Sequence, residues 1–448
     1  MDRLVKERAV GVAVVGFGYI GTVIGAVLAD RGWRVSGIDV REPVVDEINA
    51  GRTTHVREPQ IDDLLAVNVA AGRLTATTDF SVITENDIVI VTVGTPLGPD
   101  FEPIVEDIEA AAKSVAQHLR RGHLVILKST VPPFTTERLV LPILESSGLQ
   151  AGVDFGLAFC PERLAEGRAV AELTKIPVVV GAVDDKSAQA CASLWQHGLG
   201  VESVRVDTAA AAEMTKLADN LWIDLNVALA NEIAKICDGL GIDALQVIDA
   251  ANTLPKVDYN VNILRPSMGV GGYCLTKDPW FVQHLGDTLG LTLHTPRTSR
   301  TVNDSMPTYT FNLVQDLLAE QGKALADAKV AVLGIAFKSN TGDCRLTPTR
   351  HTLEHLERSG CELSVHDPWV TEREAVTVTS VPLTPDLATA VEDADAVVFL
   401  TGHQQFLDFP LSRLAELTAN GCVFLDGRNS FSPADVRAAG FVYKGIGR

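Results

Sequence analysis

Short apolar runs alternate with helix-length segments in two separate parts of the chain, and this alternation constrains the fold more than any other feature. In the first part, residues 12–15 and 34–40 are typical of strands, and residues 19–31 between them are typical of a helix. Further strand-like runs occupy residues 87–93, 123–128 and 177–180. Strands that alternate with helices indicate βαβ units and a parallel sheet.

The pattern stops near residue 208 and returns at Lys329. Residues 209–240 contain no proline and no strand-like run, and their apolar residues recur at helical spacing, which predicts one long helix. After Lys329, the runs KVAVLGIAF, CELSVHDP, DAVVFLTG and CVFLDGRN predict a second set of strands. We therefore expect an α/β fold of two Rossmann-like, doubly wound parallel-sheet domains joined by a long central helix. The predicted segments are 1–205, 206–327 and 328–448.

Only the first set of strands carries a dinucleotide-binding turn. Gly16-Phe17-Gly18-Tyr19-Ile20-Gly21 follows a strand and opens a helix, where the glycines permit a tight turn and the helix N-terminus supplies amide donors to a pyrophosphate. Asp39 ends the second predicted strand, where a carboxylate accepts from the ribose 2′-hydroxyl and repels a 2′-phosphate. These residues predict NAD rather than NADP, although Arg41 nearby argues mildly the other way.

Composition excludes several classes of partner. The chain has 38 Lys and Arg against 57 Asp and Glu, a net charge of −19, which argues against nucleic acid because phosphate backbones are bound by clustered cations. No apolar run is long enough for a membrane helix, and the charged N-terminus does not resemble a signal peptide. Seven cysteines without paired spacing predict reduced thiols in the cytoplasm and no metal site.

A candidate nucleophile lies in the run GGYCLTKDP. Gly271 and Gly272 allow a ligand to approach the Cys274 thiol, and Asp278-Pro279 is typical of a helix start, with Asp as N-cap and Pro at the first helical position. A thiol just ahead of a helix N-terminus, with Lys277 nearby, is stabilised as thiolate. A role as helix N-cap would by itself explain the presence of Asp278 before a proline. The two roles are compatible, because a carboxylate held by a helix N-terminus could also orient an attacking water.

Two further pairs have spacing that allows chemistry. Lys216 and Asn220 share one face of the predicted long helix, and Glu162 and Glu166 lie one turn apart if their segment is helical. Each pair could serve an active site. A surface lysine or a solvated acidic edge would explain the same spacing.

Together these motifs resemble the UDP-glucose/GDP-mannose dehydrogenase family, which oxidises nucleotide sugars to uronic acids with NAD. The resemblance extends over nearly the whole chain, through GFGYIG, VGTP, KSTVPP, CPERLAEG, KLADN, GVGGYCLTKDP, FKSNTGDCR and LDGRN. It implies two successive oxidations of a primary alcohol through a thiohemiacetal and a thioester. A nucleoside-diphosphate sugar is then the substrate. We expect a homodimer or higher homo-oligomer because long apolar helices between domains often form dimer surfaces, although a helix buried within its own chain would explain the same apolar stripe equally well.

The resemblance also implies a role for each motif residue. Cys274 is the nucleophile, Lys216 stabilises oxyanions beside Asn220, Asp278 handles the hydrolytic water, and Glu162 and Thr130 assist proton transfer. The implied cofactor contacts are Gly16, Gly18, Tyr19, Ile20, Gly21, Asp39, Thr95, Thr130, Glu166, Lys277 and Arg345. The implied substrate contacts are Glu162, Lys216, Asn220, Arg265, Gly271, Phe337, Lys338 and Arg428.

The chain departs from the family pattern around the sugar pocket. Pro266-Ser267-Met268 replaces a common Pro-Gly, Tyr273 precedes the cysteine where many members have His, Ser or Pro, and residues 220–224 read NLWID instead of NTYRD. Arg163, in Pro-Glu-Arg, resembles members that form N-acetylhexosaminuronates. We therefore rank UDP-glucose and UDP-N-acetylhexosamines close together, followed by dTDP-glucose, with GDP-mannose last.

Two other functions fit parts of the sequence. A single-step β-hydroxyacid dehydrogenase of the 6-phosphogluconate type also joins a Rossmann domain to a helix with a Lys-x-x-x-Asn face, but needs neither the thiol nor the second Rossmann-like domain. A nucleotide-sugar sensor on an inactive scaffold would bind substrate without making NADH. Both are separated from the main hypothesis by counting the NADH formed for each sugar.

Overall fold

A computed structural model describes residues 10–257 and 259–448, so most of the charged N-terminal segment lies outside the described residues. The chain divides into two compact units, Met1–Asp219 and Asn220–Arg448. Each unit contains one large sheet and is described by itself.

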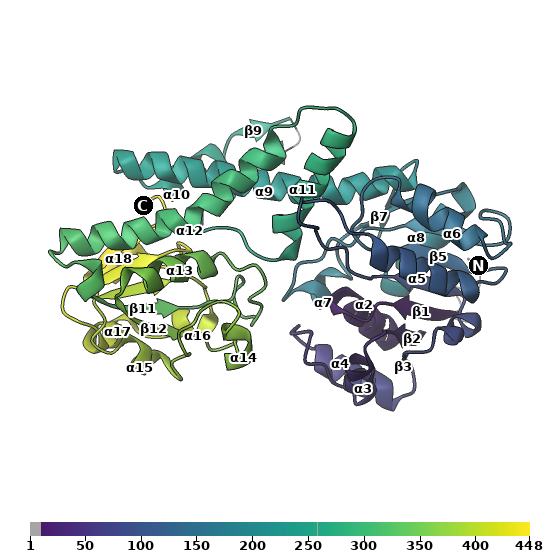
Figure 1. The fold of residues 1–448 in the computed structure, drawn as a ribbon, viewed down its shortest axis with the longest axis horizontal. Coiled ribbons are helices and arrows are strands. Elements are labelled where there is room, and N and C mark those ends of the chain that lie inside the picture. The colour runs from purple at the N-terminus through teal and green to yellow at the C-terminus, as the bar shows by residue number, and fades with distance from the viewer. Residues whose placement is uncertain (1–9, 258) are drawn as a thin grey trace. The chain divides into compact units, whose positions relative to one another are not determined.

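The first unit is built on an eight-stranded sheet in the order β3-β2-β1-β4-β5-β6-β7-β8 (Figure 1). All neighbouring strands are parallel except β6 and β7, which are antiparallel. The strands are β1 (Gly11–Val15), β2 (Arg34–Ile38), β3 (Leu74–Thr77), β4 (Ile88–Val91), β5 (Leu124–Leu127), β6 (Gly156–Phe159), β7 (Val178–Ala182) and β8 (Ser203–Arg205).

Helices cover both faces of this sheet, and the two faces form separate cores. Val12 and Val14 of β1 pack into one core, whereas Ala13 and Val15 pack into the other, as the two-residue alternation of a strand requires. The covering helices are α2 (Tyr19–Asp30), α3 (Glu42–Asn49), α4 (Ile61–Ala70), α5 (Glu106–Gln117), α6 (Leu141–Glu145), α7 (Ala169–Glu172) and α8 (Asp185–Leu199), with the short turns η1 (Phe80–Glu85) and η2 (Thr136–Val140).

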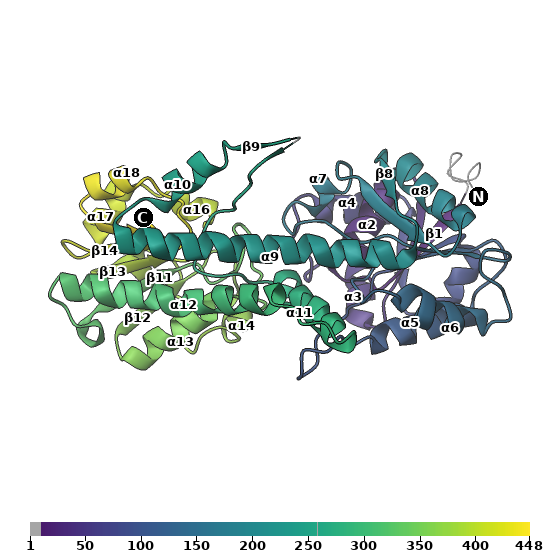
Figure 2. The same cartoon turned by 90° about the horizontal axis from the view of Figure 1, so that it is seen from above.

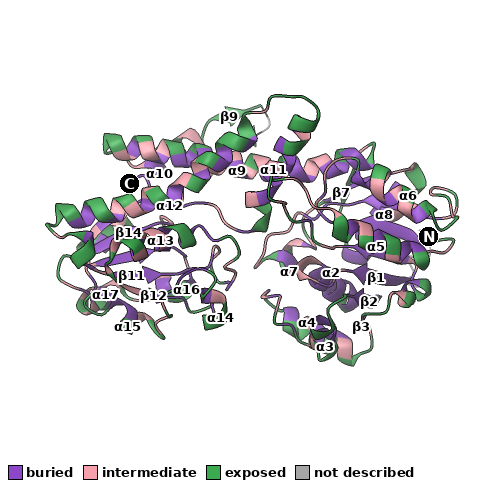
Figure 3. Cartoon of the chain, viewed as in Figure 1, coloured by how far each residue is buried: buried purple, intermediate pink, exposed green. Residues whose placement is uncertain are grey.

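The second unit contains a five-stranded parallel sheet in the order β12-β11-β13-β14-β15. Its strands are β11 (Lys329–Leu333), β12 (Glu362–His366), β13 (Ala396–Phe399), β14 (Val423–Asp426) and β15 (Val442–Gly445). The β11 side chains again alternate between two cores, and Figure 3 shows the strands of both sheets buried beneath helices with exposed outer faces.

The second unit also contains further helices and a small hairpin. They are α10 (Ala244–Ala251), α11 (Tyr273–Thr288), α12 (Thr295–Glu320), α13 (Thr349–Ser359), α14 (Glu372–Ala375), α15 (Leu387–Val391), α16 (Gln404–Leu407), α17 (Leu411–Leu417) and α18 (Pro433–Ala438), together with η3 (Leu325–Asp327) and the hairpin of β9 (Pro255–Lys256) and β10 (Tyr259–Asn260).

The predicted long helix is α9 (Ala209–Leu240), whose first residues belong to the first unit and whose remainder belongs to the second. Within the second unit, α12 runs alongside α9 (Figure 2), and Asn231 and Lys235 of α9 bond to Asn303 and Ser305 of α12.

The predicted fold class is therefore confirmed, whereas the three-segment division of the chain stays a prediction. None of the helices in the described ranges is both long and apolar enough to cross a membrane.

Candidate active site

The glycine-rich turn has the geometry that a pyrophosphate site requires. Gly16 follows β1 at φ +88°, and its N–H donates to the Ile38 carbonyl at 2.8 Å. A Cβ atom at Gly21 would lie 2.1 Å from the Gly16 carbonyl oxygen, whereas one at Gly18 would meet nothing within 4 Å. No side chain in the described ranges caps the start of α2, so its first amides remain for a ligand such as a pyrophosphate.

Asp39 lies directly after β2 and is 6% exposed. Its Oδ2 accepts from the Phe17 N–H of the glycine-rich turn at 3.0 Å, and its Oδ1 accepts from the Arg41 backbone and guanidinium, each at 3.0 Å. The carboxylate therefore faces the turn where an adenine ribose would lie, and Arg41 compensates it. The residues present fit NAD.

Tyr19 and Ile20 of the same motif contact the protein itself. The Tyr19 hydroxyl bonds to Glu58, and Glu58 Oε2 also accepts from the Gly167 N–H at 2.6 Å. Burial and then the Glu58 hydrogen bond raise the pKa of Tyr19 above its usual range, with Glu166 adding to the effect. Ile20 packs against the first core. These two side chains position the turn and tie it to the loop after β6.

Loops at the carboxyl ends of β4, β5 and β6 carry the next predicted residues. The Thr95 hydroxyl donates to the Thr130 carbonyl at 2.6 Å, which fixes two of these loops together. Glu162 is buried, and its carboxylate lies 3.8 Å from the Lys216 ammonium of α9. An ion pair at an enclosed strand end has the residue types that proton transfer and oxyanion stabilisation require.

The Cys274 thiol lies in the first turn of α11, because this helix begins at Tyr273. The expected helix start at Asp278-Pro279 is therefore wrong. Pro279 lies inside the helix and cannot donate to the Leu275 carbonyl one turn back, and Arg300 donates to that carbonyl instead at 3.3 Å. Cys274 is exposed and sits within the helix N-terminus, where the dipole favours thiolate.

Asp278 follows Cys274 by one helical turn and is fully buried. Its Oδ1 accepts from the Lys277 ammonium at 2.6 Å, and its Oδ2 accepts from the Asn220 amide at 2.5 Å. The Lys277 ammonium also lies 3.9 Å from the centre of the Phe281 ring. Lys277 thus neutralises Asp278 directly.

The two glycines before the thiol allow close packing on Phe337. A Cβ atom at Gly271 would lie 2.6 Å from the Phe337 Cβ, and one at Gly272, where φ is +83°, would lie 2.8 Å from the Phe337 ring. The predicted substrate residues Gly271 and Phe337 are therefore in direct contact in the second unit.

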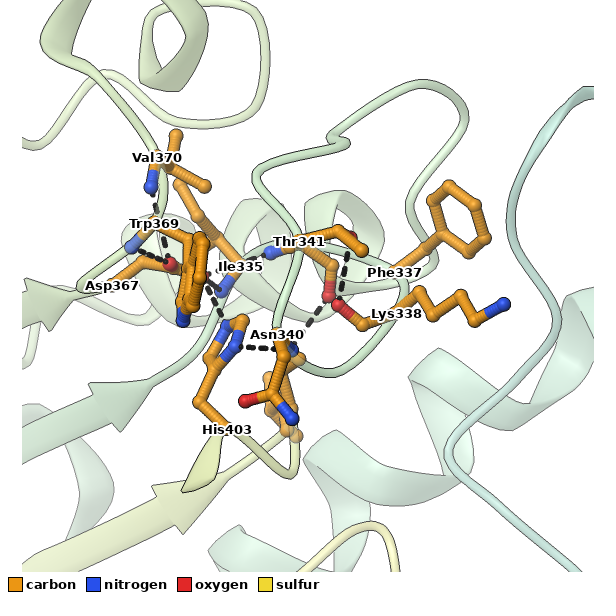
Figure 4. Close-up of polar contacts among 12 residues, drawn as sticks. Ile335, Phe337, Lys338, Asn340, Thr341, Asp367, Trp369, Val370 and His403 are labelled. Atoms are coloured by element: carbon orange, nitrogen blue, oxygen red, sulfur yellow. Dashed lines mark hydrogen bonds and ion pairs between the residues drawn. The ribbon is translucent and has the colours of Figure 1, made fainter. Parts of the chain in front are cut away.

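The loop after β11 carries Phe337 and Lys338, and a buried carboxylate holds it (Figure 4). Asp367 accepts from the backbone N–H groups of Ile335 and Ala336 at 2.8 and 3.1 Å, and from His403 Nε2 at 3.1 Å. Figure 4 shows the Lys338 side chain extending away from this cluster, where it could meet a diphosphate.

The other predicted cations have partners of their own. Arg428 donates to the Leu400 and Phe337 carbonyls at 2.7 and 3.1 Å, and burial lowers its pKa to about 10, so it remains a cation at neutral pH. Arg265 pairs with Asp249 at 2.7 Å on an exposed surface. Arg345 bonds to Asp343.

The predicted catalytic residues thus form one group in each unit. Glu162 and Lys216 form an ion pair within the first unit. Within the second unit, Asn220 of α9 hydrogen-bonds to Asp278, which lies one helical turn after Cys274 on α11. Lys216 and Asn220 lie one turn apart on α9. Thr130 belongs to the first unit, where its carbonyl accepts from the Thr95 hydroxyl.

Sequence reasoning missed several residues that hold these loops. They are Lys128, Glu58 and Glu172 in the first unit, and Asp367 and His403 in the second. Charged residues at or just after predicted strand ends were a usable signal for Lys128 and Asp367. No local pattern distinguishes Glu58 or Glu172 from surface acids.

Comparisons with known proteins agree with this geometry. Three models of the UDP-glucose/GDP-mannose dehydrogenase family match the chain: the NAD-binding domain at residues 10–198, the central domain at 210–305 and the UDP-binding domain at 331–433.

Individual relatives match over almost their whole length. The UDP-N-acetyl-D-mannosamine dehydrogenase of Pyrococcus horikoshii is 34% identical over 98% of this chain and 99% of its own, and its solved structure superposes with a TM-score of 0.86. The NDP-N-acetyl-D-galactosaminuronic acid dehydrogenase of Ralstonia nicotianae is 34% identical over 98% of this chain and 100% of its own. A UDP-glucose dehydrogenase structure from Pyrobaculum islandicum is 30% identical, covers 98% of each chain and has a TM-score of 0.84.

These matches and the fit of the glycine-rich turn assign NAD as the cofactor and nucleotide-sugar oxidation as the reaction class. The chain belongs to the UDP-glucose/GDP-mannose dehydrogenase family.

Proposed function

We propose that this protein oxidises the C6 hydroxymethyl group of a UDP-linked 2-acetamido hexose to the carboxylate, in two NAD-dependent steps through Cys274. The observation that carries the proposal is the α11 N-terminus. It places an exposed thiol in the first helical turn and a buried carboxylate, held by Lys277 and Asn220, one turn later.

The thiol supplies the covalent step. NAD accepts a hydride in each oxidation when it is bound. After the first oxidation, the Cys274 sulfur forms a bond to the aldehyde carbon, and the carbonyl oxygen gains a proton to give a thiohemiacetal. Loss of the second hydride and of that proton leaves a thioester. Water then breaks the carbon–sulfur bond, releasing the acid and the thiol, and Asp278 is placed to orient that water.

The ion pair at the end of β6 supplies the remaining polar groups. The Lys216 ammonium stabilises negative charge on the reacting oxygen, and Glu162, 3.8 Å away, takes up or returns the alcohol proton. Thr130 lies on the neighbouring loop, bonded through its carbonyl to Thr95. Asn220 orients Asp278 through its amide hydrogen bond and lies beside the position assigned to the sugar.

The UDP group is assigned to the second unit. Lys338 supplies a cation for the diphosphate, the Phe337 ring packs on Gly271, and Arg428 supports their loop through the Phe337 carbonyl. Arg265, which pairs with Asp249 on the surface, is a second candidate cation. The match to a UDP-binding domain over residues 331–433 supports this assignment.

A 2-acetamido sugar is favoured by the relatives. Two proteins that match 98% of this chain are named for N-acetylmannosamine or N-acetylgalactosaminuronic acid, whereas a UDP-glucose dehydrogenase matches at 30% identity. Arg163, which is half-buried and bonds to the Pro177 carbonyl, occupies the Pro-Glu-Arg position already noted. UDP-N-acetylhexosamines therefore rank above UDP-glucose.

The test is a screen for NADH release. UDP-N-acetylmannosamine, UDP-N-acetylgalactosamine, UDP-N-acetylglucosamine, UDP-glucose, dTDP-glucose and GDP-mannose are compared by kcat/KM. We expect a 2-acetamido sugar to be preferred, with two NADH for each sugar consumed. A preference for UDP-glucose would overturn the sugar assignment alone, whereas one NADH for each sugar would favour the β-hydroxyacid dehydrogenase chemistry.

Replacement of the thiol tests the covalent step. Cys274→Ala should lower turnover roughly a thousandfold or more, because it removes the nucleophile. Cys361→Ala, at a half-buried cysteine beside β12, is the matched control and should retain activity. Normal turnover of Cys274→Ala would remove the covalent mechanism. Substrate binding without NADH from any sugar would revive the sensor hypothesis.

A homodimer through α9 completes the proposal. Trp222, Leu229 and Ile236 recur every seven residues on this helix and are 49%, 47% and 63% exposed, a stripe of the kind that packs between helices. Light scattering should give twice the chain mass, and Ile236→Glu should shift it toward one chain. The cytoplasmic location stays a prediction.

A further inference from the structure

A buried lysine beneath the Glu162 loop has no role in the mechanism above. Lys128 follows β5 directly and is 3% exposed. Its ammonium donates to the Pro161 and Cys160 carbonyls at 3.1 and 3.3 Å, and lies 4.7 Å from the centre of the Trp195 ring of α8. Each contact is to the residues just before Glu162 or to the helix that packs beneath them.

Among the described residues, this cation has no carboxylate partner. Within the described parts of the chain, no Asp or Glu oxygen lies within ion-pair distance of the Lys128 ammonium. The nearest group able to carry negative charge is the Cys160 sulfur, 3.7 Å away. A buried ammonium held only by neutral groups is costly, so its surroundings favour ionisation of an adjacent acid.

The groups around the Cys160 sulfur come from three elements. Lys128 follows β5, Cys191 lies on α8 and hydrogen-bonds to the sulfur, and Arg163 follows in the loop of Cys160 itself. Burial alone would raise the pKa of Cys160. The Cys191 hydrogen bond and the Lys128 charge outweigh it and bring the pKa to about 7, whereas the pKa of Cys191 is raised by burial and by Cys160.

We propose that Lys128 is a positioning residue for Glu162, cross-linking the loop of Thr130 to the loop of Glu162, and that a thiolate on Cys160 balances its charge. This inference rests on the proposed function, in which Glu162 transfers a proton. Cys160 gives its proton to solvent, and the Cys191 S–H donates to the resulting thiolate, so no covalent bond changes.

The position of Lys128 explains how it acts on Glu162. Thr130 lies two residues after Lys128, and Glu162 lies two residues after Cys160, so one ammonium joins both loops at adjacent strand ends. The Glu162 carboxylate must reach Lys216 from this loop. Loss of the two carbonyl bonds would let the loop shift, and small misplacements of a proton-transfer group lower turnover strongly.

Turnover measurements test the positioning role with four variants. Lys128→Met should lower kcat by about ten- to a hundredfold, with KM for NAD changed by less than about threefold. Glu162→Gln should lower kcat at least as much, and Lys128→Met/Glu162→Gln should fall no lower than Glu162→Gln alone. Lys113→Met, at an exposed lysine paired with Glu109 on α5, is the control and should match the wild type.

The outcomes separate this inference from the proposed function. The positioning role would be overturned if the kcat of the double variant fell by the product of the two single-variant losses. It would also be overturned if the kcat of Lys128→Met equalled that of the wild type. Full activity in Glu162→Gln would instead overturn the proposed role of Glu162, and with it the positioning role of Lys128. The pairing of Lys128 with a Cys160 thiolate would then be decided by the thiolate measurement alone.

The thiolate is measured without turnover, by absorbance near 240 nm between pH 5 and 9. The wild type minus Cys160→Ser difference should show one ionisation with a midpoint near the pKa of about 7. Lys128→Met should raise that midpoint by at least about one unit, because an opposite charge is lost, and Glu162→Gln should leave it unchanged. A flat difference spectrum, or a midpoint that Lys128→Met does not move, would overturn the charge pairing.

Discussion

The two sheets carry the same turn but use it differently. In the first unit, Gly16 follows β1 at φ +88° and donates to the last carbonyl of β2, Ile38, at 2.8 Å. In the second unit, Gly334 follows β11 at φ +90° and donates to the last carbonyl of β12, His366, at 2.8 Å. Up to this point the two backbones follow one plan.

The carboxylates that follow these strands have different partners. Asp39 accepts one N–H from its turn, and its remaining bonds go to Arg41, which is 56% exposed. Asp367 accepts four backbone N–H groups, from Ile335, Ala336, Trp369 and Val370, and bonds to His403. A ribose can displace an exposed arginine but not a buried set of amides, so only Asp39 remains available to a cofactor.

The segments after the turns differ as well. In the first unit α2 starts three residues after Gly16, so helix amides face the turn. In the second unit residues 335–348 form a loop before α13, and this loop carries Lys338, the cation to which the proposed function assigns the diphosphate. The proposed function therefore assigns phosphate groups to helix amides in one unit and to side-chain cations in the other.

The largest expected effect is at Asp367. Asp367→Asn should lower the free energy of unfolding of the second unit by about 3–5 kcal/mol, because an amide nitrogen would face buried N–H donors. Asp39→Asn, the matched change, should cost about 1 kcal/mol or less. Denaturant unfolding of both variants checks this. Equal losses would show that the two carboxylates play the same structural part.

The turn glycines provide a second test. Gly334→Ala should destabilise the protein by about 3 kcal/mol, because its Cβ would lie 2.4 Å from the Thr401 Cβ at a backbone angle that alanine disfavours. Gly16→Ala should cost less, since its Cβ would lie 2.9 Å from a Val93 methyl, but should also weaken NAD binding. Thermal unfolding and NAD titration separate the two effects. A loss of NAD affinity in Gly334→Ala as well would contradict the division of roles.

The two units also carry residues of opposite charge at their strand ends, so their stabilities should depend differently on pH. Lys128 follows β5 in the first unit, whereas Asp426 ends β14 in the second, and burial raises the pKa of Asp426 to about 6. The native state then holds a proton that the unfolded chain releases near pH 4. Stability should therefore fall by about 2–3 kcal/mol as pH rises from about 4 to about 6, and stay level above that.

The control for this pH effect is Asp426→Asn, which cannot titrate at this position. Denaturant unfolding at several pH values should show the decline in the wild type and a smaller decline in the variant. Parallel curves for the two proteins would mean that Asp426 does not titrate differently in the native state.

The smallest expected effect concerns cofactor choice. Asp39→Ser should lower the preference for NAD over NADP by about tenfold, equivalent to about 1.4 kcal/mol, because the repulsive carboxylate is removed and Arg41 is released. Asp393→Ser, at an acid in a surface turn after α15, serves as a control with unchanged preference. Ratios of kcat/KM for the two cofactors decide the outcome, and an unchanged ratio in Asp39→Ser would contradict the role of Asp39.

Periodic features were predictable from the sequence, and tertiary contacts were not. The ends of α9 and the strand before Gly16 follow from apolar spacing and the glycine-rich turn. The start of α11 was wrongly predicted because Asp-Pro usually opens a helix, and only Arg300, distant in sequence, takes the carbonyl that Pro279 leaves. The position of Lys128 after a strand was visible in the sequence, but its role was not predicted, because its partners are the carbonyls of a distant loop and leave no sequence pattern.

The division between the two units falls inside α9, between Asp219 and Asn220, without a flexible linker. A protease that prefers exposed, irregular chain would find no such segment at this boundary. A gene fragment ending there would contain only one part of α9, and the helix would end at the new terminus without its natural continuation. Shortened versions of this protein should therefore keep α9 whole, and redesign of either unit should treat this helix as belonging to both.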